Sequence, residues 1–168
     1  MRRLDKTLLI AAAITIASGI GLHFLFNAWP SILTEFIAPV NESLWEHIKL
    51  IFWPYLVAGL YLTRVGKWEP APWLVTLLLL CALLLGGGWV IYWKLGGGLA
   101  LDVAWYFILM GLGFLLPVVL PAKDKWTELL MCLVIILAGL IICWTIDPPN
   151  HDLFHDLALV DTFYQLPC

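Results

Sequence analysis

Residues 41–49 read Asn-Glu-Ser-Leu-Trp-Glu-His-Ile-Lys, which places an amide, two carboxylates, an imidazole and an ammonium between two apolar runs. Ser43 is followed three residues later by Glu46, a capping-box pattern that predicts the start of a helix. We expect this helix to continue through the apolar residues 50–53, so that its first turns are polar. The simplest interpretation is a capped helix whose start is fixed by an ion pair between Glu46 and Lys49.

The composition around this stretch is that of a membrane protein. Hydrophobic residues make up 62% of the chain and charged residues only 12%, whereas soluble domains average roughly 25% charged residues. The 168 residues leave room for about five spans of roughly 20 residues each. We therefore expect one integral membrane domain, residues 1–168, in contact with membrane lipid.

The apolar runs predict an all-α polytopic bundle of about five transmembrane helices. The predicted spans are about 8–26, 43–63, 73–93, 99–120 and 127–146. Between the first two spans, Pro30 and Pro39 bracket a segment too polar to cross a membrane. Apolar residues recur at helical spacing within 32–37, which predicts a short interfacial helix. An acidic tail, residues 148–168, follows the last span.

The basic residues predict the orientation of the bundle. A cytoplasmic amino terminus satisfies the positive-inside rule, because seven of the nine basic residues then lie in the cytoplasm and two outside. The seven are Arg2, Arg3, Lys6, Arg64, Lys67, Lys123 and Lys125, and the two are Lys49 and Lys94. With five spans, the tail is extracytoplasmic. We expect a multi-pass protein of the cell membrane.

This topology brings the histidines and most carboxylates to the outer face. The residues expected there are His23, Glu35, Glu42, Glu46, His47, Asp102, His151, Asp152, His155 and Asp156. Because the orientation was derived from Lys and Arg alone, this gathering is an independent observation. It predicts a polar site at the extracytoplasmic end, with Glu46, His47, Glu42, Lys49 and Asp102 as candidate catalytic residues.

Imidazoles and carboxylates from separate helices can provide three ligands to zinc and leave a fourth position for water. The candidate metal ligands are His47, His23 and Glu46, with zinc or another divalent metal as the cofactor. Glu46 and His47 are neighbours and point about 100° apart on a helix, so one would bind the metal and the other act as base or orienting group. The chain has neither an HExxH pattern nor paired Cys-x-x-Cys motifs.

The 41–49 stretch also resembles a family of small polytopic membrane proteins from bacteria and archaea whose function is unknown. In that family a first span ends near a histidine, and Pro-Val-Asn-Glu-Ser-x-Trp-Glu-His-x-Lys precedes a helix containing proline. Here His23, residues 39–49 and Pro54 correspond to this pattern. The tail residues His151 and His155 are not part of it, which favours the site residues nearer the first two spans. The resemblance implies no activity.

Three kinds of function remain open from the sequence. The first is a membrane-embedded hydrolase or transferase acting on a lipid-like substrate, with Glu46 or His47 as general base. The second is a small solute or ion transporter, against which the chain shows no internal repeat and only Glu128 as an acidic residue near the inner half of a span. The third is a structural or partner-binding membrane protein. No basic patch indicates nucleic-acid binding, and the oligomeric state stays open.

Overall fold

A computed structural model describes residues 6–121 and 124–158 of the chain. Within these residues it contains six α-helices, two short 3-10 turns and no β-strand. The elements are α1 (Lys6–Ala28), α2 (Ile32–Ile37), α3 (Leu44–Arg64), α4 (Pro70–Leu95), α5 (Leu99–Val119), η1 (Asp124–Trp126), α6 (Thr127–Ile146) and η2 (Asp152–Phe154). Arg2, Arg3, Lys123 and residues 159–168, which entered the predicted topology, lie outside the described residues.

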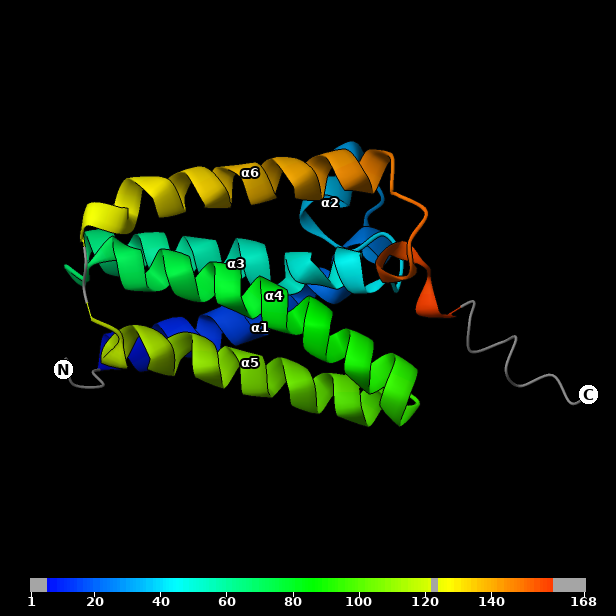
Figure 1. Ribbon diagram of the computed structural model, residues 1–168, viewed down its shortest axis with the longest axis horizontal. Coiled ribbons are helices and arrows are strands. Elements are labelled where there is room, and N and C mark those ends of the chain that lie inside the picture. The colour runs from blue at the N-terminus through cyan, green and yellow to red at the C-terminus, as the bar shows by residue number, and fades with distance from the viewer. Residues whose placement is uncertain (1–5, 122–123, 159–168) are drawn as a thin grey trace, which may run out of the picture.

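The predicted all-α architecture is confirmed. Five long helices run roughly side by side, and consecutive long helices point in opposite directions (Figure 1). Four of them, α1, α4, α5 and α6, are long and apolar enough to cross a membrane. The fifth, α3, corresponds to the predicted second span but is not among these four; its sequence includes Glu46, Lys49 and Arg64.

The helix boundaries follow local sequence signals. α4 begins at Pro70, three residues before the predicted start, because proline fits the first turn of a helix where its missing N–H is not needed. The short helix predicted within residues 32–37 is present as α2, capped by Ser31. Gly96, Gly97 and Gly98 all have positive φ angles, so this run forms the turn between α4 and α5.

The centre of the bundle is α3, which packs against α1, α4, α6 and η2. Thirteen of its 21 residues are buried. The Tyr55 hydroxyl donates a hydrogen bond of 2.6 Å to the Gly113 carbonyl, which ties the middle of α3 to α5 as well. Gly19 of α1 lies close to the carbonyl of Leu50, where an added Cβ would come within 2.6 Å of the oxygen. Pro54 leaves this same carbonyl without its helical donor.

The two ends of the bundle differ in chemistry. Lys6, Arg64 and Lys67 lie at the end where α1 begins, and the chain leaves α6 for η2 at the opposite end (Figure 1). His23 in the last turns of α1 and His47 in the first turn of α3 share that second end with the tail. All four histidines of the chain are therefore at one end of the bundle.

Candidate functional site

The start of α3 is built by short-range hydrogen bonds. Ser43 is the N-cap residue, and its hydroxyl accepts a hydrogen bond of 3.3 Å from the backbone N–H of Glu46. The N–H of Ser43 itself donates to the side-chain oxygen of Asn41 at 2.9 Å. Only half of the predicted capping box is present, because Asn41 takes the place expected for the Glu46 side chain. This frees the Glu46 carboxylate to point into the protein.

Glu46 and Lys49 form a fully buried ion pair, as the sequence predicted. Nζ of Lys49 lies 2.5 Å from Oε2 of Glu46, and the exposed fractions of the two side chains are 0% and 3%. The ammonium also donates to the backbone carbonyls of Glu35, at 2.8 Å, and Ala38, at 3.3 Å. All three of its N–H donors are thereby used. Because all donors of the ammonium are used within the protein, Lys49 has a structural role and has no donor left for a substrate.

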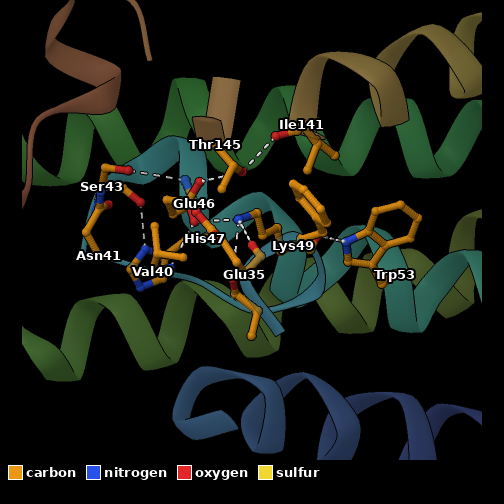
Figure 2. A network of polar contacts seen from close by, with 12 residues as sticks. Glu35, Val40, Asn41, Ser43, Glu46, His47, Lys49, Trp53, Ile141 and Thr145 are labelled. Carbon is orange, nitrogen blue, oxygen red and sulfur yellow. Dashed lines mark hydrogen bonds and ion pairs between the residues drawn. The ribbon is translucent and has the colours of Figure 1, made fainter. Parts of the chain in front are cut away.

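The Glu46 carboxylate holds two further parts of the molecule. Its Oε2 accepts a hydrogen bond of 2.9 Å from the backbone N–H of Val40. Its Oε1 lies 3.1 Å from the Thr145 hydroxyl of α6, which is also 2.8 Å from the Ile141 carbonyl. Figure 2 shows these groups converging on Glu46 from the segment before α3 and from α6.

The same network fixes the short helix α2. Carbonyls at the end of a helix lack intrahelical donors, and basic side chains commonly satisfy them. Here Lys49 donates to the carbonyl of Glu35, and Nε1 of Trp53 donates to that of Phe36 at 3.0 Å. The last turn of α2 and the chain leaving it are therefore fastened to α3 by two of its side chains (Figure 2).

A second cluster, the His–Glu–His cluster of His23, Glu42 and His47, lies beside this network. Nε2 of His47 is 3.4 Å from Oε2 of Glu42, and Nε2 of His23 is 4.0 Å from Oε1 of Glu42. The two imidazole rings have their centres 5.5 Å apart. Within the described part of the chain, these three residues are the group whose potential ligand atoms all lie within 4.8 Å of one another.

The electrostatics of the cluster favour a charged carboxylate. The hydrogen bond with His47 holds the pKa of the Glu42 carboxyl below its ordinary value, partial burial opposes this, and the charges of His47 and His23 add to the lowering. Asp102, in the first turn of α5, adds negative potential at His47. The side chains are accessible, with exposed fractions of 31% for His23, 46% for Glu42 and 25% for His47.

The donor set fits a divalent transition metal. Nδ1 of His47 lies 2.8 Å from the Ser43 carbonyl, so in the neutral ring this nitrogen carries the proton and Nε2 presents its lone pair. Tetrahedral zinc with bonds of about 2.0–2.1 Å requires ligand atoms separated by about 3.3 Å. The distance of 3.4 Å between Nε2 of His47 and Oε2 of Glu42 matches this separation. Nε2 of His23 lies 4.0 Å from the other oxygen, Oε1, so His23 would need to move closer by roughly 0.7 Å or more.

The structure thus divides the predicted site residues into two groups. His23 and His47 lie together, but the carboxylate beside them is Glu42, whereas Glu46 is engaged by Lys49, Val40 and Thr145. The rotation between neighbouring positions on a helix explains why Glu46 and His47 serve different groups. Sequence reasoning missed Thr145, which lies about a hundred positions away, although a hydroxyl near the end of an apolar span is a visible signal.

The turn η2 packs against the start of α3 and the end of α6 through aromatic contacts. The ring centre of Phe154 in η2 lies 5.1 Å from that of Trp45 and 5.5 Å from that of Trp144. The ring centres of the two tryptophans are 4.7 Å apart. His151 caps η2, where its Nδ1 accepts a hydrogen bond from the N–H of Leu153 at 3.3 Å. His155 lies 4.0 Å from Asp152 of its own segment. Neither tail histidine belongs to the His–Glu–His cluster.

Comparison with known proteins places the whole bundle in one family. The model of the family described as "Family of unknown function (DUF6512)" matches residues 1–161, nearly the full length of the chain. No curated protein and no solved structure matches the chain.

Proposed function

We propose that this chain, which belongs to the Family of unknown function (DUF6512), is a membrane protein that binds a divalent transition metal through His23, Glu42 and His47. Zinc is the metal that this donor set fits best, because two imidazoles and one carboxylate form a common catalytic zinc site. The observation that carries the proposal is the convergence of the three side chains from α1, the segment before α3, and α3 itself.

The reaction class follows from the number of ligands. Three protein ligands leave a fourth position for water, whose pKa falls towards neutrality when zinc binds it. Zinc bound there would supply an activated water for attack on an ester or phosphoester, with release of the alcohol. An acceptor alcohol in place of that water would make the same site a transferase. The Ser43 carbonyl orients His47 by its contact with Nδ1, so that Nε2 faces Glu42. We therefore assign the site to a hydrolase or transferase.

A lipid-like substrate fits the position of the cluster. Four of the helices are long and apolar enough to cross a membrane, and the cluster lies at one end of them, at the level expected for lipid headgroups. The ring of His23 packs edge-on against Phe24, with 5.1 Å between ring centres, and Phe24 is 61% exposed. A ligand histidine next to a lipid-facing ring favours a substrate that approaches from the bilayer.

Metal analysis of the purified protein tests this proposal. In detergent at neutral pH, with excess zinc removed by gel filtration, we expect close to one zinc ion per chain. His47→Ala should lose it, whereas His151→Ala and His155→Ala serve as controls and should retain it. Folded wild-type protein that holds no zinc after incubation with the metal would overturn the metal site.

The orientation of the site end is a second part of the proposal. The basic residues Lys6, Arg64 and Lys67 at the opposite end support a cytoplasmic amino terminus and an extracytoplasmic cluster. Single cysteines at positions 66 and 152, in a background without native cysteines, can be labelled with a membrane-impermeant thiol reagent on intact cells. We expect labelling at 152 alone; labelling at 66 alone would place the cluster on the cytoplasmic side.

A further inference from the structure

We infer that Glu46 is a positioning residue for the metal site, acting through the backbone of Val40 on Glu42, two residues further along the chain. This inference rests on the proposed metal site and adds to it a residue that does not touch the metal. The relevant contact is the hydrogen bond of 2.9 Å from the Val40 N–H to Oε2 of Glu46.

The segment that carries Glu42 has little structure of its own. Residues 38–43 lie between α2 and α3 and belong to neither helix. Pro39 cannot donate a backbone hydrogen bond, and it favours the extended conformation that Ala38 adopts, with φ −122° and ψ 153°. The orientation of Glu42 towards the two histidines therefore depends on how this segment is anchored at each end.

The buried ion pair makes both contacts in the first half of this segment, and at the other end the N–H of Ser43 donates to the side chain of Asn41. Lys49 holds the segment at the Ala38 carbonyl, at 3.3 Å, and Glu46 holds it at the Val40 N–H. Glu46 is itself held by Lys49 and by Thr145 of α6, with a side chain that is only 3% exposed. The buried Glu46 carboxylate thus fixes the backbone at Val40, two residues before the partly exposed carboxylate of Glu42.

This positioning role gives a reason for the buried pair of Glu46 and Lys49 beside the His–Glu–His cluster, although removing two charges from water is energetically costly. Buried pairs can often be replaced by apolar side chains without loss of stability, so stability alone does not require one here. An apolar replacement would, however, offer no acceptor to the Val40 N–H. We therefore expect the acceptor oxygen at position 46 to be needed for tight metal binding even where the fold does not need the charge.

Two double variants separate positioning from stability. Glu46→Leu with Lys49→Met removes both charges and the acceptor, whereas Glu46→Gln with Lys49→Met removes both charges but keeps an amide oxygen for the Val40 N–H. Zinc affinity is measured by competition with a chromophoric chelator, in detergent, on protein shown to be folded by circular dichroism. Hydrogen exchange at residues 40–43 is followed in the same metal-free samples.

For the leucine variant we expect zinc affinity about 10- to 100-fold weaker than wild type, with a stoichiometry still near one. Exchange at residues 40–43 should be faster. The glutamine variant, which loses the Lys49 contact with Ala38 but keeps an acceptor for Val40, should bind zinc more tightly than the leucine variant. Tyr55→Phe, which removes a buried hydrogen bond far from this segment, should stay within about threefold of wild type. If the leucine variant does not fold, Glu46→Met with Lys49→Met takes its place.

The outcomes distinguish the inference from the proposal on which it rests. Wild-type protein that binds zinc, together with a folded leucine variant of equal affinity, would overturn the positioning role and leave the metal site intact. An equal loss of affinity in both double variants would assign the effect to the lost charges and overturn the role of the Val40 contact. Wild-type protein that binds no zinc would overturn both.

Discussion

The helices α3 and α6 have almost the same length, 21 and 20 residues, but opposite surroundings. α3 buries thirteen residues, including an ion pair, whereas α6 buries only Val134 and Ile141. α6 qualifies as a membrane span by hydropathy and α3 does not. Other parts of the protein surround α3, which can thus carry charged side chains. The outer surface of α6, at the edge of the bundle, is formed by its own apolar side chains.

This difference in burial indicates where the ionisable residues of a functional site can lie. Ionisable groups within a membrane helix are costly unless they face protein and find partners, and the first turns of α3 provide such partners on two sides. On one side Glu46 and Lys49 bind α2 and α6, and on the other His47 meets Glu42 and His23. Function is therefore expected at the start of α3, and the exposed positions of α6 should tolerate substitution.

The largest effect is expected when one charge of the buried pair is removed. Lys49→Met leaves Glu46 as an unpaired buried carboxylate, and we expect a loss of about 3–5 kcal/mol in the free energy of unfolding. On α6, Ile135→Ala alters a side chain that is 66% exposed and should change stability by less than about 0.5 kcal/mol. Unfolding in mixed micelles of increasing denaturing detergent measures both.

Adding Glu46→Leu to Lys49→Met should recover most of that loss, because the unpaired charge is then gone. An α6 variant as damaging as Lys49→Met would contradict the contrast between the two helices. A Lys49→Met variant as stable as wild type would show that the pair is not buried in the membrane-embedded protein.

A smaller effect is expected where α1 touches α3. An added methyl at Gly19 would collide with the Tyr106 hydroxyl and lie 2.6 Å from the Leu50 carbonyl, whereas Gly21 has open space around it. Gly19→Ala should therefore cost about 1–3 kcal/mol, and Gly21→Ala should be neutral or slightly stabilising. Equal thermal stabilities of the two variants would contradict the close approach of the helices.

The smallest effect concerns the pH dependence of Glu42. Because the hydrogen bond with His47 lowers the pKa of this carboxyl in the folded protein, its contribution to stability is present above the ordinary pKa of about 4.3. That contribution is lost as the pH falls through the lowered folded pKa. The side chain is 46% exposed, so solvent screening keeps the contribution below about 1 kcal/mol.

Melting temperatures of metal-free protein between pH 3 and 6 measure this dependence. Glu42→Gln should flatten the part of the curve that belongs to this group, whereas Glu128→Gln, at the opposite end of the bundle, should leave it unchanged. A curve that keeps its slope in Glu42→Gln would remove Glu42 from the cluster.

Much of this architecture could be predicted from the sequence. Apolar runs located all five long helices to within a few residues, and the polar stretch 41–49 identified the start of the central one. The pairing of Glu46 with Lys49 followed from their separation of three residues on a helix. These features are encoded by periodicity and short-range spacing, which a single sequence displays directly.

Other features depend on contacts between distant parts of the chain. Hydropathy separates α3 from the four more apolar helices, but it does not show which helices enclose α3. The choice of Glu42 rather than Glu46 beside the histidines depends on the path of the non-helical residues 38–43. The contacts of Thr145 and Phe154 bring the last third of the chain to the start of α3, which no local pattern encodes.

The most direct test of the central claim is X-ray absorption spectroscopy of the zinc-loaded protein, because it counts the ligands by type. We expect two imidazole nitrogens and the remaining ligands oxygen, all at about 2.0–2.1 Å from the metal. His23→Ala should reduce the imidazole count to one, and His151→Ala should leave it at two. Sulfur ligands at about 2.3 Å, or a spectrum without imidazole scattering, would contradict a metal site formed by His23, Glu42 and His47.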